Sequence, residues 1–141
     1  YGPAGRPDMV MFRYTKWINE ATTLRVNGDG TQTRGFTYID DIARGTILAL
    51  KPVGYEVFNL GGHESISLIE LIKIMENKIG KTAVIEHFSS HKADMRANEA
   101  DTTKAKEILG WTPQISLNEG ITKMVKWYNN GKKWVSKIKT G

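Results

Sequence analysis

The stretch that decides the fold is Asn27-Gly28-Asp29-Gly30-Thr31-Gln32-Thr33-Arg34-Gly35-Phe36-Thr37-Tyr38-Ile39-Asp40-Asp41. Before it, residues 24–27 alternate apolar and polar side chains, which predicts a short strand. Gly28-Asp29-Gly30 predicts a tight turn, because glycine tolerates positive φ angles. Residues 36–39 are aromatic or β-branched and predict a second strand, after which Asp40 or Asp41 is placed to cap a helix to about residue 50. This order of strand, turn, strand and helix predicts an α/β fold.

Helices and strands continue to alternate on both sides of this stretch. Ser67 and Ser116 each stand three residues before a glutamate, the spacing of a capping box at the start of a helix. Asp8 is placed to cap an earlier helix. In chain order, we expect a helix at 8–21, a strand at 55–60 buried on both faces, a helix at 67–80, a strand at 83–88, a polar loop at 89–98, a short helix opened by Asp101 or Thr102 and closed by Gly110, and a helix at 117–131.

Length and charge favour one domain with a basic end. The chain has 141 residues and a formal charge of +5, and the five lysines after residue 125 account for the whole excess. We therefore predict a domain at 1–131 and a basic tail at 132–141, with the tail a solvated helix end or linker. The sequence has no cysteine and no long apolar run. A cytoplasmic protein that binds neither nucleic acid nor membrane is the simplest expectation.

Two stretches resemble a known family. The run 27–41 and the opening Tyr1-Gly2-Pro3-Ala4-Gly5-Arg6-Pro7-Asp8-Met9 are similar to the carboxy-terminal half of the extended short-chain dehydrogenase/reductases that act on nucleotide sugars. Among these, the UDP-glucuronate 4-epimerases are the most similar, and the resemblance extends to about residue 128. It implies an α/β substrate-binding portion of mixed short strands and helices, with most of the Rossmann core absent.

The resemblance also implies how a longer parent protein would work. In the family, the glycine-rich turn that binds NAD and the catalytic Tyr-x-x-x-Lys precede the Tyr-Gly-Pro element, which here begins the chain. NAD takes a hydride from C4 of the sugar, a 4-keto intermediate forms, and the hydride returns to the other face. This chain would hold the UDP-sugar with no catalytic residue, cofactor-binding residue or metal ligand of its own, and would be inactive alone. We expect a homo-oligomer, most simply a dimer.

Arg34 is the leading candidate for a phosphate-binding residue. It lies between a glycine-rich turn and a strand, where a planar guanidinium can bind two phosphate oxygens at once. The resemblance implies contact with the pyrophosphate, although the family usually has Arg-Asp-Phe where this chain has Arg34-Gly35-Phe36. From spacing alone, an arginine at the start of a strand is more often a solvated surface residue.

Further substrate-binding residues are implied by the resemblance. Arg25, Val26 and Asn27 match the strand that lies against the uracil ring, although Val26 also suits an ordinary half-buried strand. Asp8 and Met9 match the start of the helix beside the sugar nucleotide, and a plain N-cap is an equal alternative for Asp8.

The loop His91-Lys92-Ala93-Asp94-Met95-Arg96 resembles the family's Arg-x-Gly-Asp element, which closes on the ribose and phosphates. Asp94 keeps the acidic position. His91 stands where arginine is common, and either Lys92 or Arg96 is an alternative source of the charge.

Three other patterns are weak. Tyr128 and Lys132 have the Tyr-x-x-x-Lys spacing, but a glycine between them predicts that the helix ends there. His87 and His91 lack a third metal ligand nearby. Gly61-Gly62 lacks the remaining glycines of a phosphate-binding turn.

Two alternatives stay open. Dehydratases and decarboxylases of the same family share this substrate half, so the reaction type rests on similarity alone. A non-catalytic binding module that uses the lysine tail on an anionic surface is the rival from another class, and salt-dependent binding would favour it.

Overall fold

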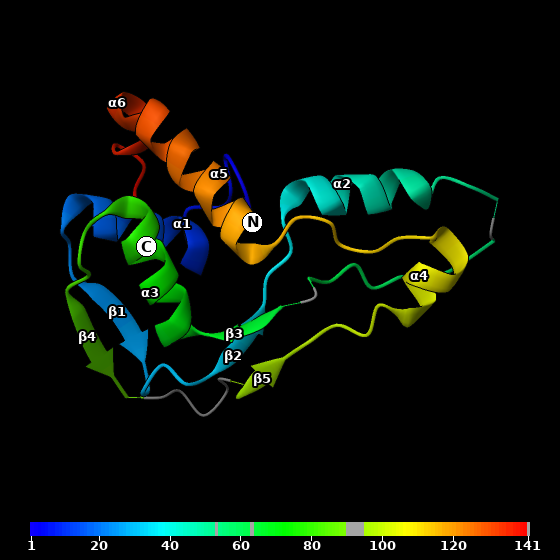
Figure 1. Cartoon of the computed structure of the whole chain (residues 1–141), viewed down its shortest axis with the longest axis horizontal. Coiled ribbons are helices and arrows are strands. Elements are labelled where there is room, and N and C mark those ends of the chain that lie inside the picture. The colour runs from blue at the N-terminus through cyan, green and yellow to red at the C-terminus, as the bar shows by residue number, and fades with distance from the viewer. Residues whose placement is uncertain (53, 63, 90–94, 141) are drawn as a thin grey trace.

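The computed structural model describes residues 1–52, 54–62, 64–89 and 95–140 (Figure 1). Within these ranges, the elements in chain order are α1 (Val10–Glu20), β1 (Leu24–Asn27), β2 (Thr33–Gly35), α2 (Ile39–Leu48), β3 (Ser65–Ser67), α3 (Leu68–Ile79), β4 (Ile85–Phe88), β5 (Ala97–Asn98), α4 (Thr103–Leu109), α5 (Leu117–Asn130) and α6 (Lys132–Val135). The predicted α/β class is confirmed. No helix in these ranges is long and apolar enough to cross a membrane.

The strands form two small sheets. β1 and β4 pair in parallel, with Leu24 opposite Ile85 and Asn27 opposite Phe88. β2 lies between β3, which is antiparallel to it, and β5, which is parallel. In β1 the side chains of Leu24 and Val26 are buried, whereas those of Arg25 and Asn27 are exposed. The two-residue period of the strand therefore presents both polar side chains on the face opposite the core.

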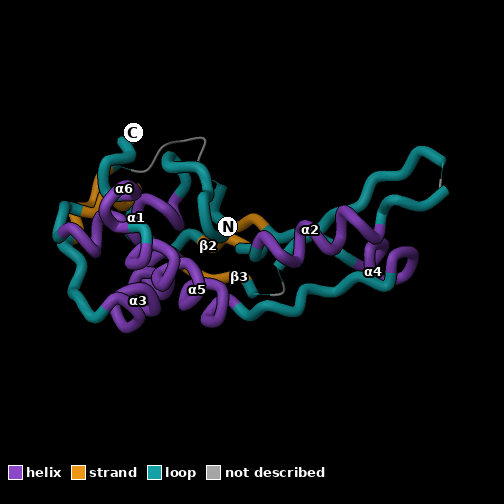
Figure 2. Tube along the Cα trace, turned by 90° about the horizontal axis from the view of Figure 1, so that it is seen from above, coloured by secondary structure: helices purple, strands orange, loops and turns teal. Residues whose placement is uncertain are grey.

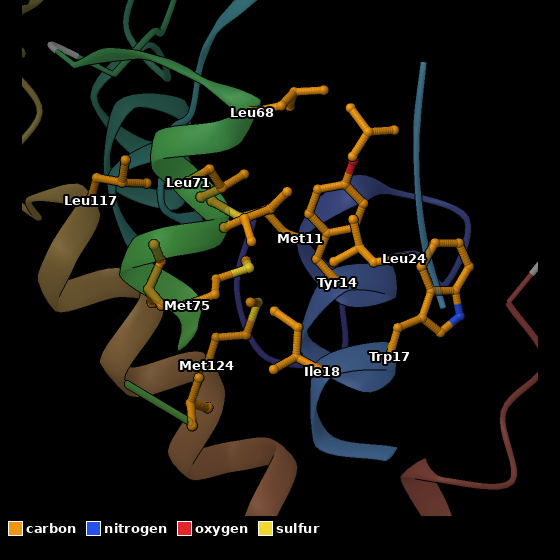
Figure 3. Packing of buried hydrophobic residues seen from close by; sticks show 14 residues of the cluster. Met11, Tyr14, Trp17, Ile18, Leu24, Leu68, Leu71, Met75, Leu117 and Met124 are labelled. Carbon is orange, nitrogen blue, oxygen red and sulfur yellow. The ribbon is translucent and has the colours of Figure 1, made fainter. Parts of the chain in front are cut away.

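The main core lies where α1, α3 and α5 meet β1. Figure 3 shows side chains from these four elements converging on one another. Each helix contributes residues spaced three or four apart, as an amphipathic helix does when one stripe is buried. The buried cluster comprises Met11, Tyr14, Trp17, Ile18, Leu24, Val26, Leu68, Leu71, Ile72, Met75, Leu117, Ile121, Met124 and Val125.

A long extension made of α2, α4 and their connecting loops projects from this helical body (Figures 1 and 2). A separate small core holds it together, in which Ala105, Leu109 and Trp111 are buried against Ala49, Phe58 and Leu60. The indole N–H of Trp111 donates to the Asp41 carbonyl oxygen at 2.9 Å, which ties the far part of the extension to the start of α2.

The predicted second strand at 36–39 is wrong. β2 ends at Gly35, and α2 begins at Ile39. The backbone between them is bonded to the first residue instead, because the Tyr1 amino group donates to the Thr37 carbonyl oxygen at 2.7 Å and the Ile39 N–H donates to the Tyr1 carbonyl oxygen at 2.8 Å.

The predicted caps of the first two long helices are also wrong. Met9 occupies the N-cap of α1, while the Asp8 carboxylate pairs with Arg6 at 2.5 Å. Tyr38 occupies the N-cap of α2. Asp41 lies inside that helix and accepts backbone N–H groups from the segment before α5, so it fastens the two segments together.

The predicted buried strand at 55–60 is wrong as well. Residues 56–60 have no regular secondary structure, and Tyr55 and Val57 are 93% and 63% exposed. In the part of the chain that the structure describes, no strand pairs with this segment. A strand buried on both faces needs neighbours to cover it and to pair with its backbone.

The locally encoded features are confirmed. Ser67 and Glu70 form a reciprocal capping box at the start of α3, and Gly80 ends that helix in the left-handed region at φ 73°. Ser116 caps α5 by accepting the Glu119 N–H, but of the two predicted capping boxes only that of α3 is described with both reciprocal bonds. Strand β1 has the predicted bounds, and β4, α4 and α5 lie within two residues of theirs.

The lysine-rich segment is folded onto the body. Val135 of α6 is fully buried in a cluster with Phe12 and Tyr128. Lys16 donates to the Ser136 carbonyl oxygen, and the Trp17 indole N–H donates to the Thr140 hydroxyl at 3.0 Å. The boundary at residue 131 stays a prediction, but the segment beyond it contributes to the core.

Candidate functional site

A pocket of about 530 Å³ lies beside the polar face of β1. Its lining includes Val10, Arg13 and Tyr14 of α1, Arg25 and Asn27 of β1, and Gln32 and Arg34 at β2. Leu68 of α3, Phe88 of β4 and the following Ser89 complete it. Small-molecule sites commonly enclose about 300 to 1,000 Å³, so the volume suits a ligand of that size.

The described lining residues of the pocket carry only positive charge. Arg13, Arg25 and Arg34 come from three different elements, and none of the described lining residues is acidic. A guanidinium stays protonated throughout the physiological pH range. Three fixed positive charges around one cavity favour an anionic ligand.

Arg34 is held by its own strand and by the segment that leads into β5. Its Nη1 donates to the Thr33 carbonyl oxygen at 2.8 Å and to the Met95 carbonyl oxygen at 2.7 Å. The strand is paired on both sides, to Ile66 of β3 and Asn98 of β5. The guanidinium is thus held in place at the pocket, which reduces the entropy lost when it binds an anion.

Phe88 offers a flat apolar surface next to this cationic group. Phe88 is 38% exposed, and the Arg25 guanidinium carbon lies 5.4 Å from the centroid of its ring. Nearby, the Gln32 side-chain amide donates to the Asn27 carbonyl oxygen at 2.8 Å. Aromatic rings stack with nucleobases, and amides supply hydrogen bonds to their edges. The pocket therefore combines surfaces suited to a planar base with cations suited to phosphate.

The turn between β1 and β2 has a fixed shape. Gly28 and Gly30 adopt φ angles of 68° and 80°, as the sequence predicted. A Cβ atom on Gly30 would lie 2.6 Å from the Ile69 side chain, so only glycine fits. The Asp29 carboxylate accepts the hydroxyl and backbone N–H of Thr31 at 2.7 and 3.0 Å, and these bonds lower the pKa of Asp29. The turn positions Gln32 and Arg34 relative to β1.

The structure brings together part of the predicted site. Arg25, Asn27 and Arg34 line the pocket. Val26 is fully buried in the core, and Asp8 and Met9 are exposed residues that are not among those lining the pocket. The predicted contacts of His91 and Asp94 lie outside the described residues. The ligand roles of all these residues remain predictions.

Arg13, Tyr14 and Phe88 line the pocket without having been predicted to bind a ligand. Tyr14 matches the apolar face of α1 and is indeed buried, and its hydroxyl donates to the Arg25 carbonyl oxygen at 3.4 Å. Burial raises the pKa of this hydroxyl. In the sequence, Phe88 is an aromatic residue at the end of a predicted strand, and Arg13 is a cation on a predicted helix. Neither pattern predicts that these two segments pack side by side.

The weak patterns have structural explanations. Tyr128 is buried and donates to Glu20 at 2.9 Å, and α5 ends before Lys132, so these two residues form no catalytic pair. Burial, reinforced by the bond to Glu20, raises the pKa of Tyr128. Gly62 lies against the Phe36 carbonyl group, where a Cβ atom would clash. Among the described residues, no cluster of three metal-binding side chains occurs.

The chain matches known proteins along most of its length. The family model described as GDP-mannose 4,6 dehydratase matches residues 9–124. A UDP-glucuronate 4-epimerase of Thermodesulfobacterium geofontis is 52% identical over 99% of this chain and 43% of its own length. A UDP-glucuronic acid decarboxylase of Arabidopsis thaliana is 38% identical over 73% of this chain and 23% of its own.

Solved structures agree with these sequence matches. The UDP-glucuronic acid 4-epimerase of Bacillus cereus, in complex with UDP-glucuronic acid and NAD, superposes with a TM-score of 0.86 at 38% identity. The match covers 92% of this chain and 42% of that structure, so the chain spans less than half the length of such relatives. The chain belongs to the nucleotide-sugar epimerase and dehydratase family of the extended short-chain dehydrogenase/reductases, as the sequence predicted.

Proposed function

We propose that this chain is the UDP-sugar-binding part of an NAD-dependent 4-epimerase that interconverts UDP-glucuronate and UDP-galacturonate. The observation that carries the proposal is the pocket itself, where Arg34 and Arg25 meet Phe88 and Asn27 with no acidic residue among the described lining. Arg34 would bind the diphosphate, and the surface of Phe88, Arg25 and Asn27 would hold the uracil. The Bacillus cereus relative, whose complex contains UDP-glucuronic acid, supports the choice of ligand.

NAD does not fit the residues that the structure describes. A dinucleotide needs a glycine-rich turn between a strand and a helix N-terminus. The glycine pair here, Gly61 and Gly62, is packed against Ala100 and Phe36, and the next described element after it is β3 rather than a helix. We therefore assign NAD to other parts of a longer protein, and to this chain only the binding and orientation of the UDP group. The chain alone should not turn over substrate.

The test is calorimetric titration of the 141-residue chain with UDP, with uridine for comparison. We expect saturable binding of UDP that weakens as salt rises, and weaker binding of uridine, because the phosphates meet the arginines. Phe88→Leu should weaken the binding of both ligands, since it removes the aromatic surface but keeps an apolar side chain. A chain that fails to bind UDP, or one that epimerises UDP-glucuronate when NAD is added, would contradict the proposal.

A decarboxylase is the second candidate, supported by the Arabidopsis relative. The two reactions differ in the fate of the sugar carboxylate. A full-length protein that contains this chain should convert carboxyl-labelled UDP-glucuronate to an isomer that retains the label. Release of labelled CO₂ would instead identify a decarboxylase.

A non-catalytic module that binds an anionic surface through its lysines predicts a different result. Deletion of 132–141 is a poor test, because it would remove the buried Val135. Replacing the exposed Lys132, Lys133, Lys137 and Lys139 with glutamine leaves that packing intact. This variant should bind UDP normally if the pocket is the functional site.

A further inference from the structure

We infer that Arg13 is a specificity-determining residue that makes this pocket select two adjacent phosphates over one. The inference rests on the proposed function and assigns a role to a residue on the helix side of the same pocket. Arg34 supplies a cation from β2, whereas Arg13 supplies one from α1. A ligand that carries a single phosphate would satisfy one of these groups and leave the other without an anion.

The surroundings of Arg13 differ from those of an ordinary surface arginine. Its Nε atom is buried and has no hydrogen-bond partner among the described residues. Arg6 and Arg44 pair with Asp8 and Asp41, but no described carboxylate pairs with Arg13. Buried polar groups are nearly always hydrogen-bonded in folded proteins. An unsatisfied nitrogen on a residue that lines a pocket with three arginines is an open donor, which a phosphate oxygen of a bound ligand could fill.

The position of the guanidinium is well defined even without that partner. Its central carbon lies 4.4 Å from the centroid of the Trp17 ring. Trp17 is buried and is itself fixed by the bond from its indole N–H to Thr140. Cations over an indole face are held electrostatically. Arg13 is thus oriented before any ligand arrives, so the binding of a second phosphate costs little additional ordering.

Arg25 is less suited to this second role. Its guanidinium lies over Phe88, where the proposed base would stack. Among the described lining residues, Arg13 is therefore the cation left for a second phosphate. The expected consequence is discrimination between nucleoside diphosphates and monophosphates, which differ by one phosphate group and share the same base and ribose.

The experiment compares UDP, UMP and uridine by calorimetric titration of the 141-residue chain. We expect Arg13→Gln to lower the affinity for UDP about tenfold and the affinity for UMP less than twofold, and to leave the affinity for uridine unchanged. Arg13→Lys keeps the charge and should restore part of the preference for UDP. Lys126→Gln, which removes one exposed positive charge on α5 away from the pocket, should leave all three affinities unchanged. Circular dichroism should verify that each variant is folded.

The outcomes separate this inference from the proposed function. If the unaltered chain does not bind UDP, the proposed function fails. If it binds UDP and Arg34→Ala weakens that binding, but Arg13→Gln leaves the ratio of UDP to UMP affinity unchanged, only the role of Arg13 is wrong. Equal losses for UDP, UMP and uridine would likewise overturn it, because they would mean that Arg13 merely supports the fold. If Arg13→Gln does not fold, Arg13→Lys is compared with the unaltered chain at high salt. A ratio of UDP to UMP affinity that is the same in both would contradict the role of Arg13.

Discussion

Arg34 should dominate phosphate binding because its guanidinium is already held by the carbonyl oxygens of Thr33 and Met95. A hydrogen bond to a charged group contributes about 1.5 to 3 kcal/mol, which corresponds to a tenfold to hundredfold change in affinity. Arg34→Ala should weaken UDP binding by that factor in calorimetric titration. Arg34→Lys should recover only part, because an ammonium cannot make a two-pronged contact.

The matched control for Arg34 removes positive charge elsewhere. Lys132→Ala and Lys133→Ala alter exposed residues of α6 and should change UDP affinity little. If the UDP affinity of Arg34→Ala stays within twofold of that of the unaltered chain, Arg34 has no phosphate-binding role.

Asp41 should be a major determinant of stability. Its carboxylate is 2% exposed, and it accepts N–H groups of Gln114 and Ile115 at 2.9 to 3.0 Å and pairs with Arg44 at 2.7 Å. Asp41→Asn should lower the free energy of unfolding by about 2 to 4 kcal/mol, because an amide has one acceptor oxygen and adds a buried donor. Urea denaturation measures the loss, and Asp40→Asn, at the exposed neighbour, is the control.

The same carboxylate predicts how stability varies with pH. Burial alone would raise the pKa of Asp41, but the bonds from Ile115, Arg44 and Gln114 outweigh it, so the pKa lies below its ordinary value. The unfolded chain then binds the proton more readily, with a pKa of about 3.9. The stabilisation is fully present above that pKa and is lost as pH falls through the folded pKa. Asp41→Asn should therefore show a shallower loss of stability below about pH 4, and an unchanged acid limb would contradict this.

At the scale of elements, α3 depends on its capping box. The Ser67 hydroxyl accepts the Glu70 N–H at 3.3 Å, and the Glu70 carboxylate accepts the Ser67 N–H at 3.1 Å. Ser67→Ala should destabilise the protein by about 0.5 to 2 kcal/mol, because it leaves a donor at the helix start without its partner. Urea denaturation would measure this, and Ser65→Ala, two residues earlier on an exposed site, should have little effect. Equal effects at both serines would rule out a capping contribution.

At the scale of the whole molecule, the extension formed by α2, α4 and their loops should cause self-association. Four of its apolar residues, Ile47, Leu50, Tyr55 and Val57, are between 63% and 93% exposed. Exposed apolar surface of this kind favours association. Light scattering should show a mass that rises with concentration, and Leu50→Glu combined with Val57→Lys should reduce it.

The control for self-association lies at the other end of the molecule. Trp134 of α6 is 53% exposed and far from the extension (Figure 1). Trp134→Lys should leave the association unchanged. A chain that is monomeric at high concentration would contradict the prediction and with it the expected dimer.

The sequence by itself determined the features that depend on neighbouring residues. The two glycines of the β1–β2 turn, the capping box of α3 and the alternation in β1 depend on residues within a few positions of one another. The family resemblance, which is confirmed, also follows from short stretches, and it implied that Arg25, Asn27 and Arg34, which line one pocket, belong to a single site.

Only the tertiary structure decided the features that need distant partners. Asp41 reads as a helix cap, yet it binds N–H groups 73 and 74 residues away. Residues 55–60 read as a buried strand, yet in the described chain no neighbouring strand covers them. In the sequence, Arg13 is one polar residue of a predicted helix. It belongs to the site because α1 packs beside β1, where Arg25 and the ring of Phe88 lie. Periodicity records which face of an element is apolar, but contacts between elements are set by packing free energy summed over the whole core.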